Sequence, residues 1–320
     1  MPKIVIPDDA PPQMKGTKAL EQLQEYGEVA LFNTKASSQG ELIERMKEAK
    51  VAINVRAYSK FTEEVFAGCP SLKLLSVLGT GTDNVDLAAA SKHDVVVTNT
   101  PGFAAVAVAE HALALMLSVA RRICVIDREV RKDKWPRGLM TQLHGKTLGL
   151  VGLGAIGGQL ARIGKGIGMK AIAWTFNPSA ERAQKHGVEL MSLEDILRKA
   201  DILSIHVRLT PQSQNLIGKK ELSLMKPTGI IINTARGPII NQEALVDALA
   251  EGKIAGAGLD VFDEEPIPPG NPLLGLDNVV LTPHNAGMTP EIIEKGAQMA
   301  VDNIINYLQG NPTYVVNKGE

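Results

Sequence analysis

The sequence predicts an α/β protein built on parallel β-sheets that are covered by helices on both faces. Short runs rich in valine, isoleucine and leucine alternate with helical stretches along the whole chain. Most of these runs are apolar at consecutive positions, which is typical of strands buried on both faces. In the second half, a glycine-rich turn directly follows one such run and opens a helix, as expected where a buried strand passes into a covering helix.

Five strands are expected in the first third of the chain, and helical stretches such as 38–50 separate most of them. A long helix near 103–122 then interrupts the alternation, and a polar stretch with Trp135 and Pro136 follows at 131–145. The expected strands are 3–7, 28–33, 51–56, 72–79 and 94–99.

A second α/β series follows and contains six expected strands. Six strands in a βα rhythm make a doubly wound domain, with helices on both faces of one sheet. The last helical stretch, within 286–310, has no following strand to cover, so it is predicted to return to the first domain. The six strands are 146–152, 169–174, 200–207, 229–235, 255–262 and 278–284.

The totals indicate an ordinary globular protein and exclude several functional classes. The 320 residues are enough for two domains, and a net charge of −1 leaves no basic surplus for nucleic acid. The N-terminal stretch lacks the features of a signal peptide, and the alanine-rich stretch 103–120 contains Glu110 and His111, so no membrane span is expected. A cytoplasmic protein is therefore expected. Cys69 and Cys124 lie in apolar contexts and are predicted to be buried free thiols.

The segment 148–168 carries a glycine pattern typical of dinucleotide binding. Gly152, Gly154 and Gly157 have the G-x-G-x-x-G spacing between an apolar strand and a helix. Gly152 would allow the tight turn, Gly154 would let the backbone approach a pyrophosphate, and Gly157 would let helix and strand pack closely. The free N–H groups of the helix would face the phosphates. The alternative is a turn whose glycines serve packing alone.

The acidic residue that usually follows the second strand of such a domain is missing. An aspartate there would bind the ribose hydroxyls and repel a 2′-phosphate. Here the strand ends in Thr175, Phe176 and Asn177, and Arg182 follows in the next turn. The choice between NAD and NADP therefore stays open, with NAD slightly favoured.

Charged residues stand at the ends of three later strands. Arg236 follows one strand, Asp260 and Glu265 lie at the end of the next, and His284 ends the last. In open α/β sheets, ligands gather at the carboxyl ends of the strands. An acid or base, a carboxylate to orient it and a fixed cation are what carbonyl reduction beside a nicotinamide needs. Taken singly, Arg236 could be a helix-start ion pair and Glu265 a solvated loop acid.

Six motifs in order along nearly the whole chain resemble the D-isomer-specific 2-hydroxyacid dehydrogenase family. They are segments 77–87, 98–117, 145–157, 233–245, 256–266 and 282–287. The resemblance implies an NAD(P)-dependent enzyme that interconverts a 2-keto acid and a D-2-hydroxy acid. Arg236 would bind the substrate's carboxylate and carbonyl, His284 would exchange the proton, and Glu265 would orient the imidazole.

The resemblance also implies the layout and the remaining contacts. A flavodoxin-like substrate domain would comprise 1–99 and 288–320, and a Rossmann-type cofactor domain 100–287. The long helix and the Trp135 region would form a homodimer contact, and no metal is implied. The expected cofactor contacts are Gly152, Gly154, Ala155, Ile156, Gly157, Thr175, His206, Val207, Thr234, Ala235, Asp260 and Gly287. The expected substrate contacts are Leu78, Gly79, Arg56, Arg236 and His284.

Some departures and rivals remain. Many members have Pro at Arg208, Ser or Thr at Ala107, and Asp at Thr175, which affects the cofactor cleft. Arg56 could equally be a surface arginine.

Glu265 argues against a formate dehydrogenase, and the set of charged residues at the strand ends does not match an S-adenosylhomocysteine hydrolase. An NAD(H)-sensing corepressor on the same fold is the alternative function. Glyoxylate, hydroxypyruvate, phosphoglycerate and bulkier 2-keto acids all stay open as substrates.

Overall fold

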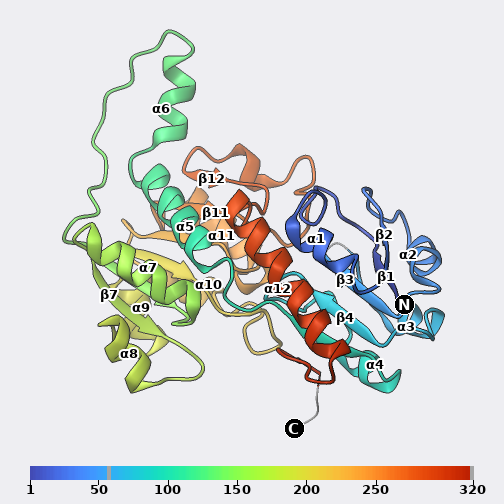
Figure 1. Cartoon of the computed structure of the whole chain (residues 1–320). Coiled ribbons are helices and arrows are strands. Elements are labelled where there is room, and N and C mark those ends of the chain that lie inside the picture. Colours follow the sequence, from blue (N-terminus) through green and yellow to red (C-terminus); the bar gives the residue numbers. More distant parts are fainter. Residues whose placement is uncertain (56–58, 318–320) are drawn as a thin grey trace. The chain divides into compact units, whose positions relative to one another are not determined.

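The computed structural model describes residues 1–55 and 59–317, and the chain forms two compact units. One unit comprises 1–103 and 288–320, and the other comprises 104–287. Each unit is an α/β fold around its own parallel sheet (Figure 1). The predicted fold class is confirmed in both units.

The sheet of the first unit has five parallel strands in the order β2-β1-β3-β4-β5. This is the flavodoxin-like order, in which the chain crosses over once beside the first strand. The strands are shorter than the apolar runs that predicted them, because the flanking residues turn into loops. They are β1 (Lys3–Ile6), β2 (Glu28–Leu31), β3 (Val51–Asn54), β4 (Leu74–Val77) and β5 (Val96–Asn99).

Five helices belong to this unit, including the last helix of the chain. The Ser76 hydroxyl donates to the Ala300 carbonyl at 3.1 Å, and the Asn303 amide donates to the Asn99 carbonyl at 2.9 Å. These two bonds tie the last helix, α12, to the ends of β4 and β5. The helices are α1 (Lys18–Leu23), α2 (Gln39–Met46), α3 (Glu63–Gly68), α4 (Leu87–Lys92) and α12 (Pro290–Leu308).

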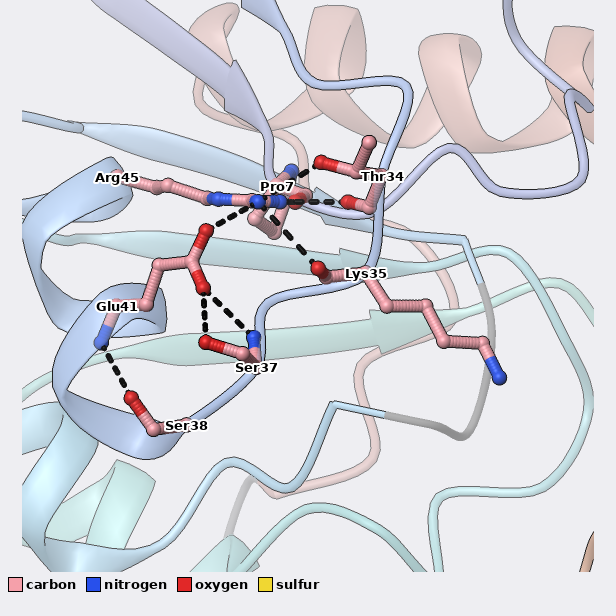
Figure 2. Close-up of polar contacts among 7 residues, drawn as sticks. All are labelled: Pro7, Thr34, Lys35, Ser37, Ser38, Glu41 and Arg45. Carbon is pink, nitrogen blue, oxygen red and sulfur yellow. Dashed lines mark hydrogen bonds and ion pairs between the residues drawn. The ribbon is translucent and has the colours of Figure 1, made fainter.

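A nearly buried arginine on α2 fastens the loop after β2 to the end of β1. Figure 2 shows the Arg45 guanidinium donating to the carbonyls of Pro7 at 2.5 Å and Thr34 at 2.6 Å, and to Glu41 at 2.5 Å. Glu41 also accepts from the hydroxyl and N–H of Ser37. The Ser37 hydroxyl, the Ser37 N–H and Arg45 together lower the pKa of Glu41 to about 2. One planar cation with five donors thus ties two segments of backbone to α2.

The second unit has a seven-stranded parallel sheet in the order β12-β11-β10-β9-β6-β7-β8. Its order matches the doubly wound dinucleotide-binding arrangement, with one strand added beyond β11. Six strands were predicted, and that number is wrong by one. The missed strand, β8, has two residues and no apolar run to reveal it. The strands are β6 (Thr147–Val151), β7 (Lys170–Trp174), β8 (Glu189–Leu190), β9 (Ile202–Ile205), β10 (Ile230–Asn233), β11 (Gly256–Leu259) and β12 (Val279–Leu281).

The helices of this unit begin with α5, which packs on α7 and over β10 and β11. A Cβ at Gly258 would lie 2.9 Å from the Leu115 Cβ, so glycine in the strand permits this close packing. None of the helices in the described parts of the chain is long and apolar enough to cross a membrane. The helices are α5 (Ala105–Ala120), α6 (Ile123–Val130), α7 (Ala155–Gly166), α8 (Ala180–His186), α9 (Leu193–Lys199), α10 (Lys219–Leu224) and α11 (Gln242–Ala250).

Helix α6 and the following segment 131–142 form an arm that projects from the second unit (Figure 1). Arg122 separates α6 from α5 with a left-handed backbone, φ 51°. No residue of α6 is buried, and Trp135, Leu139 and Met140 are exposed as well. Cys124 lies on this arm and is exposed, so the prediction of a buried thiol is wrong for Cys124 and confirmed for Cys69. The apolar neighbours of Cys124 misled the prediction, because they lie on a helix that has no buried residue.

Candidate active site

The register of the second sheet aligns one residue from each of six strands along its carboxyl edge. Trp174, Val151, Ile205, Asn233, Leu259 and Leu281 are paired across the sheet in that order. The residues that follow them form a row, which we call the edge row: Thr175, Gly152, His206, Thr234, Asp260 and Thr282. Five of these six were predicted as cofactor contacts from the sequence, and the register places them side by side.

Glu265 and His284 lie just beyond this row and are hydrogen-bonded to each other. The Nδ1 atom of His284 is 2.7 Å from Oε2 of Glu265, and Oε1 of Glu265 accepts from the Phe262 N–H at 3.1 Å. Burial alone would raise the pKa of Glu265, but the bond and charge of His284, the Phe262 N–H and the charge of Arg236 lower it. Glu265 is therefore an ionised acceptor, which requires the proton of the imidazole to be on Nδ1.

Arg236 follows β10 and belongs to the same group. The Asn233 side chain fixes the loop, donating to the Arg236 carbonyl at 2.8 Å and accepting from the Ala235 N–H at 3.0 Å. The next residue, Gly237, packs on the loop that carries Glu265, since a Cβ there would lie 2.0 Å from the carbonyl carbon of Phe262. This role of Asn233 was not predicted from the sequence, although an asparagine that ends a buried strand often fixes the loop that follows it.

His284 has a left-handed backbone, with φ 52°, which is uncommon for a residue other than glycine. The fully buried carboxylate of Asp260 holds the turn on both sides of it. Its Oδ1 accepts from the Thr282 hydroxyl at 2.6 Å and the Asn285 N–H at 3.0 Å, and its Oδ2 accepts from the Ala286 N–H at 3.0 Å. A strained conformation persists where its surroundings over-determine it, and clusters at functional sites.

His111 on α5 adds a contact to the group of Asp260 and Thr282, which we call the Asp260 clamp, and this contact was not predicted from the sequence. Its Nε2 lies 2.9 Å from the Thr282 hydroxyl and 3.5 Å from Oδ1 of Asp260. Because Thr282 gives its single proton to Asp260, Nε2 of His111 must be the donor to the threonine oxygen. Burial would raise the pKa of Asp260, but His111, Thr282 and the two backbone N–H groups lower it. Asp260 is therefore a charged structural acceptor, where the sequence predicted a cofactor contact.

The glycine loop has the geometry that a pyrophosphate requires. Gly152 has φ 109°, and a Cβ on it would lie 2.7 Å from the His206 carbonyl oxygen. A Cβ on Gly157 would lie 2.1 Å from the Gly152 carbonyl oxygen, whereas Gly154 faces open space. Ala155 and Ile156 begin α7, so their N–H groups point out of its N-terminus. The tight turn at Gly152 and the close packing at Gly157 agree with the parts predicted for them, and the approach of a pyrophosphate to Gly154 stays a prediction.

Two buried polar atoms of the second unit lack a hydrogen-bond partner, among the residues described. They are Nδ1 of His206 and the hydroxyl oxygen of Thr234, both in the edge row. Nε2 of His206 is 2.9 Å from the Ser204 hydroxyl, and burial lowers the pKa of the imidazole to about 3, so it is neutral. Unpaired buried polar atoms are rare and call for a partner. These two atoms, together with the open space beside Gly154, fit a polar cofactor that binds along this edge of the sheet.

The other predicted contacts are placed as follows. Thr175, Val207, Ala235 and Gly287 are half-buried residues of the second unit. In the first unit, the Leu78 N–H already donates to Asn54 and the Gly79 N–H to Val77 and the Thr100 hydroxyl. These two N–H groups are not free for a substrate, which corrects the prediction at that point. Arg56 lies outside the described residues.

Comparison with known proteins supports the interpretation of this sheet edge as a dinucleotide-binding site. The model of the D-isomer specific 2-hydroxyacid dehydrogenase NAD-binding domain matches residues 113–286. A glyoxylate reductase of Korarchaeum cryptofilum is 39% identical over 309 residues, which cover 94% of this chain and 93% of that protein. The chain belongs to the D-isomer-specific 2-hydroxyacid dehydrogenase family. The predicted family, enzyme class and use of a nicotinamide cofactor are thereby confirmed.

Further members of the family differ in what their names say they act on. A D-3-phosphoglycerate dehydrogenase of Methanocaldococcus jannaschii is 39% identical over 295 residues, covering 91% of this chain and 56% of that protein. Among solved structures, an acyclic imino acid reductase (Bsp5) in complex with NADPH and D-Arg matches with a TM-score of 0.89. It is 31% identical, and the match covers 98% of this chain and 99% of that one. Similarity therefore identifies the family, whereas the named substrates differ from one relative to another.

Proposed function

We propose that this protein reduces a small 2-keto acid to the D-2-hydroxy acid, and catalyses the reverse oxidation, with NAD(P)H as the hydride donor. The observation that carries the proposal is the hydrogen bond of 2.7 Å between Glu265 and His284. This pair lies just beyond the edge row, which includes Gly152 of the glycine loop and two residues with buried polar atoms that lack a partner. A proton source and a dinucleotide cradle on one sheet edge are the two requirements of this reaction.

His284 is proposed to supply the proton. When bound, the cofactor supplies a hydride to the carbonyl carbon, and the negative charge develops on the carbonyl oxygen. Nε2 of His284 gives its proton to that oxygen, while Nδ1–H stays bonded to Glu265, so the imidazole ends neutral. In the oxidation direction the same nitrogen takes the proton back. The carboxylate of Glu265 stabilises the imidazolium form and holds the ring in one orientation.

Arg236 is proposed to bind the substrate carboxylate and polarise the carbonyl, because its planar guanidinium can donate two parallel hydrogen bonds. A guanidinium that binds the carboxylate and the carbonyl recognises the 2-keto acid unit that many substrates share.

The substrate range is proposed from the names of the relatives. Glyoxylate, hydroxypyruvate and 3-phosphohydroxypyruvate are the first candidates, since matched relatives are named glyoxylate reductase and D-3-phosphoglycerate dehydrogenase. A 2-imino acid has the same planar, carboxylate-bearing acceptor carbon, and a structural neighbour is named an acyclic imino acid reductase. The NAD(H)-sensing corepressor function remains the alternative from another class.

The test is a spectrophotometric screen of NADH and NADPH against these keto acids, and against keto acids with ammonia or methylamine. One reacting pair would support the enzyme, and cofactor binding without any turnover would favour the sensor. His284→Gln and Arg236→Ala should each lower turnover by about 10²–10⁴-fold. His144→Gln, which changes an exposed histidine elsewhere on the second unit, is the matched control. Full activity in His284→Gln would refute the proposed role.

We also propose that the arm forms a homodimer contact and that the protein works in the cytoplasm. Ile123, Val130, Trp135, Leu139 and Met140 expose apolar surface that a second copy would cover. Replacing Trp135 and Leu139 by serine should convert a dimer to a monomer in analytical ultracentrifugation. A wild-type monomer at micromolar concentration would contradict this part of the proposal.

A further inference from the structure

The end of β7 lacks the carboxylate that selects NAD in most dinucleotide-binding domains. An acid there accepts bonds from the ribose hydroxyls and repels a 2′-phosphate. Here β7 ends at Trp174, and the next three residues are Thr175, Phe176 and Asn177. A hydroxyl and an amide can both donate to phosphate oxygens, and neither carries a negative charge. The electrostatic barrier against a 2′-phosphate is therefore absent from this strand end.

The guanidinium of Arg182 lies near the same strand end. The Gly152 N–H donates to the Trp174 carbonyl at 2.7 Å, so Thr175 lies directly next to the glycine loop. Arg182 of α8 donates from Nη1 to the carbonyl of Leu153, between Gly152 and Gly154, at 3.4 Å. The cation is therefore held over the loop where the adenosine ribose of a dinucleotide would lie. The structure records no ion pair for Arg182 within the described ranges 1–55 and 59–317.

Further positive charge lies toward the other end of α8. The Lys165 ammonium, from the last turn of α7, donates to the carbonyls of His186 and Gly187 at 3.1 and 3.2 Å. Burial lowers the pKa of His186, and the charges of Lys185, Arg182 and Lys165 lower it further. Of these three cations, Arg182 is the one that donates to the glycine loop, so it is the candidate partner of a 2′-phosphate.

We infer that the ribose site of this protein accepts a 2′-phosphate, so that NADP(H) binds more tightly than NAD(H), with Arg182 as its charge partner. Thr175 donates a hydroxyl hydrogen bond to the same phosphate. This inference rests on the proposed function, because it specifies the cofactor of that reaction. It differs from the slight preference for NAD that the sequence suggested, because the sequence did not show that Arg182 reaches the glycine loop.

The competing explanation is structural: Arg182 would serve only to tie α8 to the glycine loop. Under that explanation, removing the guanidinium would weaken the binding of both cofactors equally, together with the stability of the unit. Under the inference, the loss would fall on the phosphorylated cofactor alone. The contrast between the two cofactors separates the explanations, whatever the effect on stability.

The experiment is a calorimetric titration of the full-length protein without substrate, using NADPH, NADH, adenosine 2′,5′-bisphosphate and 5′-AMP. A charge-assisted hydrogen bond corresponds to roughly 10–100-fold in the dissociation constant. NADPH should therefore bind at least about 10-fold more tightly than NADH, and the bisphosphate should exceed 5′-AMP by a similar factor. Raising the salt concentration should narrow both gaps.

Two variants and one control sharpen the test. Arg182→Gln should lower NADPH affinity by about 10-fold or more and leave NADH affinity within about twofold. Thr175→Asp should reverse the preference, because a carboxylate repels the 2′-phosphate. Arg198→Gln, which removes an exposed arginine paired with Glu194 on α9, should leave the preference unchanged. Equal or tighter binding of NADH to the wild-type protein, or equal losses for both cofactors in Arg182→Gln, would overturn the inference. Binding without any keto-acid turnover would contradict the proposed function and leave this inference standing.

Discussion

Two buried aspartates, one in each unit, lie at the carboxyl ends of parallel strands, and their pKa values shift in opposite directions. Asp8 follows β1 and Asp260 follows β11, and both are fully buried. Asp260 has three short hydrogen bonds and a nearby imidazole, and its pKa is lowered. Among the described residues, no group meets the geometry of a hydrogen bond to either oxygen of Asp8, although the Ser59 hydroxyl and the Val55 N–H lie near. Burial raises the pKa of Asp8, and Ser59, Val55 and the charge of Arg45 reduce that rise without cancelling it.

The difference teaches that burial alone does not decide what a carboxyl group does. Removing a carboxylate from water penalises its charge, and only donors aimed at its oxygens compensate. Asp260 receives such donors from the catalytic turn, so its negative charge organises that turn. Asp8 receives few such donors among the described residues, so the effect of burial dominates and its pKa is raised. The three predictions that follow separate these two situations.

The largest effect is expected for Asp260→Ala. It leaves the N–H groups of Asn285 and Ala286 and the hydroxyl of Thr282 without the acceptor that they now have. The free energy of unfolding should fall by about 3–5 kcal/mol, and turnover by about 10²-fold as the turn moves His284. Urea denaturation and steady-state kinetics measure the two losses. Asp260→Asn keeps one acceptor oxygen and should lose less. A change below about 1 kcal/mol in Asp260→Ala would mean that the clamp is not needed.

A smaller effect is expected for Thr282→Val, which keeps the shape and removes the hydroxyl between His111 and Asp260. The loss in stability should be about 1 kcal/mol. The rate constant for turnover should fall while the dissociation constant of the cofactor stays the same, because the change acts through the orientation of His284. Thr282→Ser keeps the hydroxyl and should restore turnover. If serine fails where valine also fails, packing of the threonine methyl matters more than the bond.

The smallest effect, and the most diagnostic, is expected for Asp8→Asn. Since Asp8 has a raised pKa, its contribution is fully present below the unfolded pKa near about 4 and is lost as the pH rises through the folded pKa. Asp8→Asn does not titrate, so its stability relative to the wild type should increase over that window. Urea denaturation from about pH 4 to about pH 8 would show this. A fall in the stability of Asp8→Asn relative to the wild type as the pH rises would show that the pKa of Asp8 is not raised.

Asp260 should show the opposite dependence on pH, because its pKa is lowered. Its contribution to the free energy of unfolding is present above about pH 4 and is lost as the pH falls through the folded pKa. The wild type should therefore gain stability relative to Asp260→Asn as the pH rises through that window.

The sequence by itself determined the α/β class, the glycine loop and the set of Arg236, Glu265 and His284. The reason is that parallel strands all end at one edge of their sheet, so residues that follow apolar runs must gather there. The glycine spacing also specified the steric needs of Gly152 and Gly157, and the structure shows both of them. These features depend on local periodicity and on a topological rule, both of which can be recognised in one chain.

Only the tertiary structure decided which polar groups find partners. His111 and Thr282 are 171 residues apart, and nothing in their local sequence indicates that they meet. The same holds for the burial of Asp260, the internal use of the Leu78 and Gly79 N–H groups, and the reach of Arg182 to Leu153. The exposure of Cys124 and the two-residue strand β8 also depend on what packs nearby. Hydrogen bonds and burial depend on approach in three dimensions to within a few ångströms, and residue order does not encode that approach in any local pattern.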